Sequence, residues 1–382
     1  MNVGILLLFW VILAILFYIY LGYPCFLFVL TVFIKSVKVN NQVKSVTIII
    51  PARNEEKIIK SKLDNCLSLN YPENLLEILV VSDQSTDQTE NIVTSFKNTH
   101  IHLISLTERH GKTAAQNMAV ERAKGEIIVF SDANAMYDND AMIHLTKHFE
   151  NLNVGCVSGE LCYHNPDKSV VGEEENFYWK YEKWIKRHED QVGSILGANG
   201  SIYAVRKSEY IPLGHDIISD FIEPLLIASR GKKVVFEPLA KSYEIASDKF
   251  IQEFQRKRRI ISRSLYGLMQ YAWLLNPLKY TMLSFELYSH KLLRWLSSFF
   301  MIILFILNMF LIGYSKVLFL LFILQGLFYL IALLGFLVKD KIKLSPIFFA
   351  PYYFCMINYA SFLGVIDYLK GQPAVFWEPI RK

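Results

Sequence analysis

Polar side chains that could carry chemistry stand where several apolar runs of this sequence end. Asp83 follows the run Leu76–Val81, and Asp132 and Asn134 follow the run Ile127–Phe130. Carboxylate and amide oxygens two residues apart, as in Asp132 and Asn134, can share one hard cation that bridges phosphates. A solvated turn is the alternative for these two residues. The pattern indicates a site for a phosphorylated ligand.

Two neighbouring motifs could bind the rest of a nucleotide. The carboxylate of Asp83 can accept the imide N–H of uracil, whereas Asp87 serves equally well as a helix cap. The segment His110–Thr113 (HGKT) precedes a helix, so Gly111 would let the backbone approach a ligand and Lys112 could reach a diphosphate. A surface turn is the alternative for this segment, because the second glycine of a P-loop is missing.

The second half of the chain adds a candidate base and a group of cations. Asp220 stands at a predicted helix start, where it could deprotonate an acceptor hydroxyl or merely cap the helix. The cations of Gln255–Arg259 (QRKRR) could meet a departing diphosphate, or could face the anionic leaflet of a membrane. The aromatic side chains of Phe177–Trp184 are more typical of a core than of an acceptor platform.

The elements that must position these residues follow from the periodicity. Short apolar runs bounded by polar loops, beginning with Val46–Ile50, are typical of buried parallel strands, and the segments between them have helical spacing. This alternation predicts an open α/β sheet, which binds ligands at the carboxyl ends of its strands. Further strands are expected at Val154–Leu161 and Lys232–Pro238, and Ile195–Arg206 is expected to be a glycine-containing turn that runs into a strand. Helices are expected at Ala141–Phe149, Glu173–His188, Ile218–Gly231 and Asp248–Met269. We interpret the strand ends as a nucleotide-sugar site.

Four charge-free runs make this chain of 382 residues too apolar for an ordinary soluble protein. They are Gly4–Ile34, Trp295–Ser315, Val317–Val338 and Leu344–Ile366, with 31, 21, 22 and 23 residues. About 20 apolar residues cross a bilayer, so the first three predict spans and the fourth a further one interrupted by prolines. A cleaved signal peptide is not expected at the start, because no basic region precedes the long first run.

The distribution of charge predicts orientation and excludes one class of partner. Lys35, Lys38 and Lys44 follow the first apolar run and no charged side chain precedes it, which places the polar domain in the cytoplasm of a plasma or inner membrane. The net charge of +5 comes without a dense basic stripe, so no nucleic-acid partner is expected. The five cysteines lack metal-ligand spacing, and we expect reduced thiols.

For the C-terminal tail, the number of predicted membrane crossings and the distribution of charge predict opposite sides of the membrane. Three C-terminal crossings after one N-terminal crossing would place the basic tail outside, although its charge favours the cytoplasm. Pro346 and Pro351 weaken the last apolar run as a spanning helix. The tail would stay inside if Leu344–Ile366 re-entered or packed within the bundle, or if the first run bent at Gly22–Pro24. We expect a cytoplasmic tail.

Taken in order, these motifs resemble the membrane-embedded family 2 glycosyltransferases, the group of the cellulose, hyaluronan and poly-N-acetylglucosamine synthases. The resemblance runs from about Val46 to Arg259 and loosely into the C-terminal runs. It rests on TIIIPARNEE, VVSDQSTDQT, HGKTAAQN, FSDAN, GANGSIYAVR, SDF with EPL, and QRKRR. It implies a GT-A fold and metal-dependent transfer of a hexosyl group from a UDP-sugar, with inversion by a single displacement.

The resemblance also implies roles for single residues. Asp132 and Asn134 take the place of a D-x-D pair around Mg²⁺ or Mn²⁺, and Asp220 that of the base. Glu55 and Asp83 would bind the uridine of the donor, and Lys112 and Asp132 its diphosphate. Gln255 and Arg258, which match a Q-x-x-R-W motif, would also bind the donor. Gly197–Gly200 would shape the acceptor side. Arg259 stands where processive synthases have Trp. This departure, together with only three C-terminal apolar runs, weakens the case for polymerisation more than that for sugar transfer. The second departure is Asn134, a neutral residue that would bind the metal less tightly than a second Asp.

These patterns predict an enzyme of polysaccharide synthesis, of exopolysaccharide or capsule type, at the membrane. Its partners would be a UDP-sugar donor, a saccharide or lipid-linked acceptor, and membrane lipids. A single-sugar transferase acting on a lipid-linked acceptor shares every motif. A transporter or receptor with a nucleotide-binding regulatory domain is more distant, because the apolar runs carry no buried charge. The predicted division is a transmembrane segment (1–34), a cytoplasmic GT-A domain (35–272), an interfacial amphipathic helix (273–292), a transmembrane region (293–369) and a tail (370–382).

Overall fold

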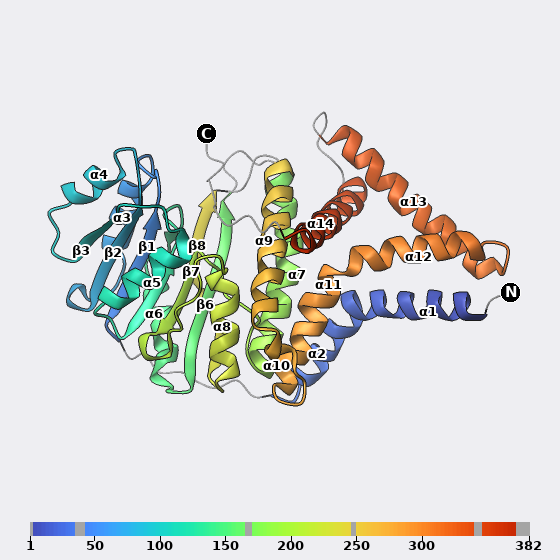
Figure 1. Ribbon diagram of the computed structural model, residues 1–382, viewed down its shortest axis with the longest axis horizontal. Coiled ribbons are helices and arrows are strands. Elements are labelled where there is room, and N and C mark those ends of the chain that lie inside the picture. The colour runs from blue at the N-terminus through green and yellow to red at the C-terminus, as the bar shows by residue number, and fades with distance from the viewer. Residues whose placement is uncertain (1–2, 35–42, 165–169, 246–249, 340–345, 372–382) are drawn as a thin grey trace.

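The computed structural model describes residues 3–34, 43–164, 170–245, 250–339 and 346–371, and Figure 1 shows their arrangement. One sheet of eight strands, in the order β3-β2-β1-β4-β7-β6-β8-β5, forms the centre of the polar half. The strands are β1 (Val46–Ala52), β2 (Leu76–Asp83), β3 (Ile101–Leu106), β4 (Ile127–Ser131), β5 (Met136–Tyr137), β6 (Val154–His164), β7 (Ile202–Arg206) and β8 (Lys233–Ile245).

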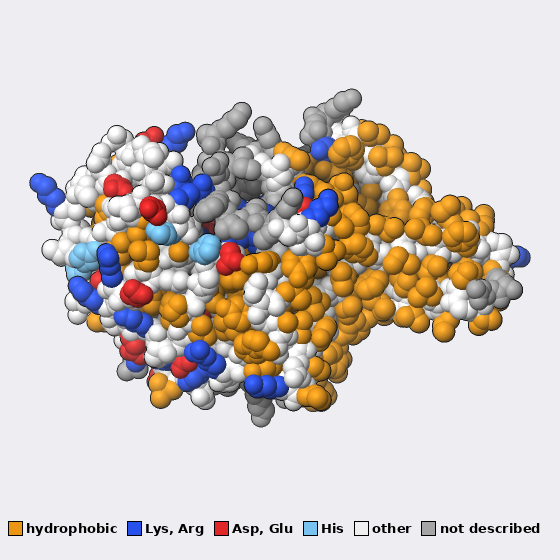
Figure 2. All heavy atoms as spheres, in the orientation of Figure 1, with side chains coloured by type: hydrophobic (Ala, Val, Ile, Leu, Met, Phe, Trp, Pro, Cys, Tyr) orange, Lys and Arg blue, Asp and Glu red, His pale blue; other side chains and the backbone are white. Residues whose placement is uncertain are grey.

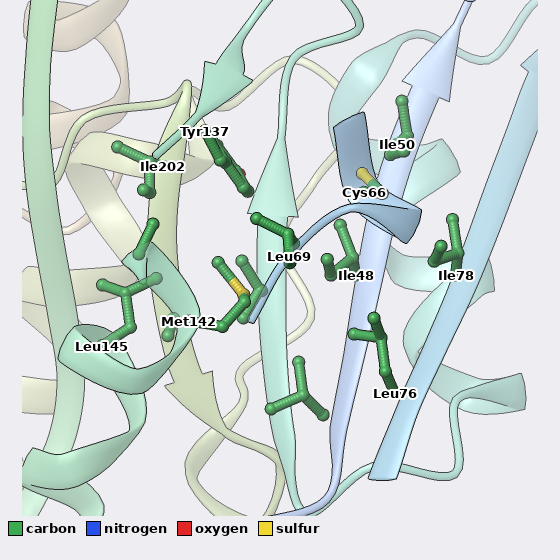
Figure 3. Close-up of a cluster of buried hydrophobic side chains, with 14 of the residues drawn as sticks. Ile48, Ile50, Cys66, Leu69, Leu76, Ile78, Tyr137, Met142, Leu145 and Ile202 are labelled. Atoms are coloured by element: carbon green, nitrogen blue, oxygen red, sulfur yellow. The ribbon is translucent and has the colours of Figure 1, made fainter. Parts of the chain in front are cut away.

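The first half of the sheet is parallel, as the apolar runs predict. β1 pairs with β2 from Val46 opposite Leu76, and with β4 from Val46 opposite Ile127. Because side chains alternate along a strand, Ile48 and Ile50 contribute to the core on one face and Ile49 to the core on the other. Figure 3 shows the first of these clusters, where Ile48 and Ile78 lie beside Cys66. All five cysteines are free, as expected.

The second half of the sheet is mixed. β7 pairs antiparallel with β4 and β6, while β6 and β8 run parallel to each other. The predicted strand at Lys232–Pro238 was too short, because β8 continues to Ile245 and pairs there with the end of β6. Pro238 does not end the strand, since the register shifts near it and the ladder resumes beyond.

Helices cover both faces of the sheet and connect it to the apolar part (Figure 1). The predicted helices are present with small shifts at their ends. They are α3 (Ile59–Leu67), α4 (Thr89–Ser95), α5 (Lys112–Arg122), α6 (Ala141–Thr146), α7 (Val170–Val192), α8 (Ser219–Ser229) and α9 (Phe250–Gln270). α8 and α9 are the two that bring the second half of the chain to the carboxyl end of the sheet.

The apolar helices gather at the opposite end of the molecule, where Figure 2 shows a surface made almost entirely of hydrophobic side chains. Among the described residues, three helical stretches are long and apolar enough to cross a membrane: Val3–Thr31, Lys316–Val338 and Ile347–Leu369. The first contains α1 (Val3–Phe17), a π-helical turn (Tyr18–Gly22) and α2 (Tyr23–Thr31), and the other two are α13 (Lys316–Val338) and most of α14 (Pro346–Leu369). Three of the four expected spans are therefore present as long apolar helices.

The expected span at Trp295–Ser315 and the expected interfacial helix before it form one bent helical segment. α12 (Ser297–Leu311) has only 15 residues, and a bend of 57° joins it to the helical stretch Thr281–Trp295. The two together are long and apolar enough to form one broken span or a re-entrant loop. α14 continues through Pro351, and half of its most apolar stretch is buried inside the protein. The tail at 372–382, whose side of the membrane was predicted, lies outside the described residues.

Candidate active site

Lys112 lies at the centre of the candidate site. It begins α5 directly after Gly111, whose φ of 86° an L-residue with a side chain rarely adopts. The Nζ atom of Lys112 donates to Asp132 Oδ1 at 2.6 Å and lies 3.4 Å from the Gly200 carbonyl oxygen. Burial alone would lower the pKa of Lys112, but the carboxylates of Asp132 and Asp220 outweigh it and raise that pKa. The ammonium group of Lys112 therefore connects the end of β4 to the loop before β7.

Asp83 fixes the backbone turn that presents Lys112. Its two carboxylate oxygens accept hydrogen bonds from the backbone N–H groups of His110 and Gly111, at 2.7 and 2.9 Å. Asp83 is only 6% exposed, so these bonds replace the water it has lost. The structure thus shows Asp83 as the support of the HGKT turn, and its predicted contact with uracil stays a prediction.

Glu55 lies at the same edge of the sheet, after β1. Its side chain is 5% exposed, and its backbone N–H donates to Thr89 Oγ1 at 2.8 Å. Asp87 Oδ1 accepts from the Thr89 backbone N–H at 3.0 Å, so the alternative of a cap at the start of α4 is the one observed. The ends of β1 and β2, which were predicted to border a nucleotide, therefore meet at Thr89.

Asp132 and Asn134 are joined by a third oxygen-bearing side chain, Glu244 of β8. The Asn134 amide hydrogen-bonds to Glu244, and burial together with the nearby charge of Asp132 raises the pKa of Glu244 to about 7. Two carboxylates and an amide present the hard oxygen atoms that Mg²⁺ and Mn²⁺ prefer. The described residues hold no group of three His, Cys, Asp or Glu side chains suited to a metal, so the amide of Asn134 would have to complete the set. These residues fit a divalent cation that also binds a ligand's phosphates.

Asp220 faces this group from the first turn of α8. Its backbone oxygen accepts from Ala198 N–H at 2.7 Å, and a Cβ on Gly200 would lie 2.2 Å from Asp220 Oδ2. Gly200 therefore allows the carboxylate to lie against the loop Gly197–Gly200. Burial raises the pKa of Asp220, as does Asp132, while Lys112, Arg263 and Lys186 oppose the rise. A half-buried carboxylate whose pKa is raised is suited to accept a proton.

Contacts from α5 and α7 position the Asp220 loop, and the sequence patterns did not reveal them. Thr113 Oγ1 donates to the Ile217 carbonyl oxygen at 2.7 Å, which ties the start of α5 to the approach to α8. Lys186 of α7 donates to Asn199 Oδ1 at 3.1 Å. Helical spacing places Lys186 on the same face of α7 as Glu182 and Glu189, but nothing local indicates what that face contacts.

The basic motif on α9 is divided between two faces of the helix. Arg258 forms two hydrogen bonds with Asp367 of α14, at 2.5 and 2.7 Å, and Gln255 is exposed. Arg259 instead interacts electrostatically with Asp132 and Asp220, and its pKa is lowered to about 10 by burial and by the nearby charges of Arg263 and Arg256. The structure thus brings Arg259 to the candidate site, and donor binding by Gln255 and Arg258 stays a prediction.

Comparison with known proteins gives a family for the polar half. Residues 47–211 match the model of the family described as "Glycosyl transferase family 2". The poly-beta-1,6-N-acetyl-D-glucosamine synthase of Staphylococcus epidermidis RP62A is 29% identical over 189 residues, 48% of this chain and 45% of that protein. The synthase of the same name from Staphylococcus aureus COL is 25% identical over 215 residues, 54% of this chain and 52% of that protein. The chain spans about half the length of the curated relatives it matches.

A solved structure covers nearly the whole fold. It is the mannosyltransferase PcManGT from Pyrobaculum calidifontis, in complex with GDP-Man and Mn²⁺. It covers 96% of this chain and 99% of its own with a TM-score of 0.71, at 19% sequence identity. The shared architecture includes the terminal apolar helices as well as the sheet, which confirms the predicted GT-A-like α/β fold. Residues 47–211 of this chain therefore form a glycosyltransferase family 2 domain, in a chain that is similar to polysaccharide synthases over about half of its length.

Proposed function

We propose that this protein is an inverting glycosyltransferase that moves a hexosyl group from a UDP-sugar to a saccharide acceptor during polysaccharide synthesis at the membrane. The observation that carries the proposal is the position of Lys112, which bonds to Asp132 and lies against the loop that holds Asp220. The residue proposed to bind the diphosphate and the half-buried residue proposed as the base thus lie close together.

The reaction would follow from these two sides. The acceptor hydroxyl passes its proton to Asp220, and its oxygen forms a bond to the anomeric carbon from the side opposite the donor diphosphate. The bond between that carbon and the diphosphate oxygen breaks, and its electron pair stays on the diphosphate. Lys112 lies where it would neutralise the developing negative charge. One base suffices for inversion, because no covalent intermediate forms.

A divalent cation is part of this proposal. Asp132, Asn134 and Glu244 would hold it, and when bound it would supply positive charge to the donor diphosphate. Burial and the like charge of Asp132 raise the pKa of Glu244 to about 7, so a cation between the two carboxylates would relieve their repulsion. The Mn²⁺ of PcManGT supports the same choice of metal.

The proposals for the donor nucleotide and for the side of the membrane depend on further residues. Glu55 and Asp83 border the place proposed for the nucleotide base, and Gln255 and Arg258 remain proposed donor contacts. PcManGT is in complex with GDP-Man, so the proposal of uridine as the nucleoside rests on the sequence motifs of this chain and not on that structure. We place the GT-A domain in the cytoplasm, on the side of the lysines that follow the first apolar helix.

A single transfer to a lipid-linked acceptor is the second candidate, and one observation favours it. Arg259, which replaces the Trp of processive synthases, interacts electrostatically with Asp220. A charged guanidinium beside the base suits a neutral growing polymer less well than an aromatic platform does.

Donor use can be tested with purified full-length protein in detergent. UDP-sugars and GDP-sugars would be supplied with Mn²⁺, with Mg²⁺ and with chelator, and release of the nucleoside diphosphate would be measured. We expect metal-dependent release of UDP from one sugar. Release of GDP alone would overturn the choice of uridine, and no release from any donor would overturn the proposed function.

A further inference from the structure

One lysine is completely buried in the core behind the candidate active site. Lys62 of α3 is 0% exposed, and it belongs to the buried face of that helix together with Ile59, Leu63 and Cys66. Lysine side chains are rarely buried completely, because the amino group loses its hydration and needs protein partners in return. The proposed reaction makes no use of Lys62, so the partners of its amino group indicate what it does.

The amino group of Lys62 contacts the segment that follows the SDAN motif. Its Nζ atom donates to the Ala135 carbonyl oxygen and lies 3.7 Å from the centre of the Tyr137 ring. Ala135 is fully buried, so Lys62 satisfies a backbone oxygen that water does not reach. Asn65, three residues further along α3, bonds to the backbone N–H and the carbonyl oxygen of Tyr137 at 2.8 and 3.0 Å. Two side chains of α3 therefore hold residues 135–137.

The segment 135–137 determines where the three proposed metal-binding side chains lie. Asp132 and Asn134 directly precede it, and the Ala135 backbone N–H donates to the Asp132 carbonyl oxygen at 3.2 Å, which closes the turn. The last two residues of the segment form β5, which pairs antiparallel with β8 directly before Glu244. This pairing brings Glu244 to the Asn134 amide. All three side chains are thus placed by one short segment that α3 holds.

Lys62 lies close to two of these three side chains but acts on them through the backbone. Burial lowers the pKa of Lys62, and the nearby Cys66, Asp132 and Glu244 oppose the fall. Its hydrogen bond goes to the turn itself, at the Ala135 carbonyl oxygen. Groups behind a metal site that fix the orientation of its ligands commonly change metal affinity by about ten- to a hundredfold when they are removed. Lys62 is in the position of such a group.

We propose that Lys62 is a positioning residue for the metal site, because through the Ala135 carbonyl it holds the turn from which Asp132 and Asn134 direct their oxygens toward one cation. The inference rests on the proposed function and deepens it by naming a residue outside the motif on which cation binding depends. Lys62 does not touch the cation and moves no proton in the transfer. An amide binds a hard cation less strongly than a carboxylate does, so the contribution of Asn134 depends especially on its being held in the right orientation.

Metal binding can be measured without any turnover. Purified full-length protein would be titrated with Mn²⁺ alone, and the free ion would be followed by its electron paramagnetic resonance signal. We expect Lys62→Met, which keeps the shape of the side chain and removes the donor, to weaken Mn²⁺ binding about tenfold or more. The exposed Lys60→Met on the same helix is the matched control and should leave the affinity unchanged. Unchanged or tighter Mn²⁺ binding by folded Lys62→Met protein would overturn the inference.

Two further variants test the same contacts if Lys62→Met does not fold. Lys62→Gln keeps a donor that can point to the Ala135 carbonyl, so it should retain part of the Mn²⁺ affinity. Asn65→Ala removes the two hydrogen bonds to Tyr137 from a half-buried position and should weaken Mn²⁺ binding severalfold. Thermal unfolding gives the melting temperature of each variant and the rise that Mn²⁺ produces. Lower melting temperatures with an undiminished rise would mean that α3 only stabilises the fold, and would overturn the inference.

The dependence of transfer on Mn²⁺ gives a further signature. Lys62→Met should raise the Mn²⁺ concentration needed for half-maximal activity about tenfold, and saturating Mn²⁺ should restore most of kcat. This result is expected because a residue that acts only through the cation matters less once the cation site is filled. A kcat that stays low at saturating Mn²⁺, with an unchanged half-saturating concentration, would contradict a role at the metal site.

The inference and the proposed function fail in different ways. A protein that releases UDP from a donor with Mn²⁺, but whose Mn²⁺ affinity does not depend on Lys62, keeps the proposed function and loses the inference. A protein whose Mn²⁺ binding is weakened by Lys62→Met, yet which releases no nucleoside diphosphate from any donor, keeps the inference and loses the transferase. A wild-type protein that binds no Mn²⁺ would overturn the inference, while metal-independent release of UDP would still support sugar transfer.

Discussion

The donor side and the acceptor side of the candidate site are built in different ways. On the donor side, Asp83 ends β2 and Asp132 follows β4, and the two lie at one edge of the sheet because both strands pair in parallel with β1. On the acceptor side, Asp220 and Arg259 come from two helices, and their positions depend on the loop Gly197–Gly200 and on packing against α14. A ligand that binds strand ends meets a rigid frame, whereas one that binds the helices meets a surface that the apolar helices also shape. Donor chemistry should therefore tolerate changes in those helices better than acceptor chemistry does.

The largest effect is expected on the acceptor side, at the base. Asp220→Asn keeps the size of the side chain and removes its capacity to accept a proton, so transfer should fall by about 10³-fold or more. Nucleotide affinity should stay nearly unchanged, because a base acts in the transition state. Single-turnover transfer and calorimetric binding of UDP would measure the two. Turnover close to that of the wild type would contradict the role of Asp220.

A smaller loss of activity is expected on the donor side, and there the affinity for the donor should fall as well. Asp132→Ala removes the carboxylate that binds Lys112, so donor affinity and activity should both fall, by about a hundredfold. Asn134→Asp should keep activity and need less Mn²⁺ for half-saturation, because a carboxylate binds hard cations more tightly than an amide does. Metal titrations that matched the wild type in both variants would place the metal elsewhere.

The boundary between the two sides can be tested at Gly200. A methyl group there would collide with Asp220 Oδ2, so Gly200→Ala should displace the base and lower kcat about tenfold, with little change in the KM for the donor. Gly326→Ala in α13 is the matched control, because a Cβ there meets nothing within 4 Å. If donor KM rose as much as kcat fell, the two sides would not be separable in this way.

The smallest effect on turnover is expected at Glu223, one turn along α8 from Asp220. Burial raises the pKa of Glu223 to about 8, although the Tyr203 hydroxyl at 3.3 Å opposes the rise. The folded state therefore keeps a proton that the unfolded state loses above about pH 4.5, so stability contributed by this group falls as pH rises from there to about 8. Glu223→Gln should remove this fall and raise stability at pH 7.5 by on the order of 2 kcal/mol.

Thermal unfolding at pH 5 and pH 7.5 would measure this prediction. The variant should gain at pH 7.5 and differ little from the wild type at pH 5, while its rate of transfer stays within the same order of magnitude. A loss of stability at pH 7.5 would mean that Glu223 is ionised and paired in the folded protein. The acceptor side would then hold a second charged carboxylate next to the base.

The elements that sequence patterns identified are those with a local physical cause. A buried strand needs consecutive apolar residues and ends where the chain turns polar, so Val46–Ile50, Leu76–Val81 and Ile127–Phe130 reveal both the strands and the residues at their ends. The same locality reveals the glycine at φ 86° before Lys112 and the start of α8 at Asp220. Donor-side candidates could therefore be found without any tertiary information.

The features that only the tertiary structure decided depend on contacts between distant segments. Glu244 joins Asp132 because β8 continues beyond Pro238, and Lys186 reaches Asn199 because α7 lies across the sheet. A helix shows from its sequence which residues share a face, but not which neighbour each face will meet. That is why Arg258 and Arg259, adjacent in one motif, bind α14 and face the base respectively. By itself, the sequence determined the strand ends, the donor-side candidates and the apolar helices, whereas packing of α9 against α8 and α14 decided which cations belong to the site.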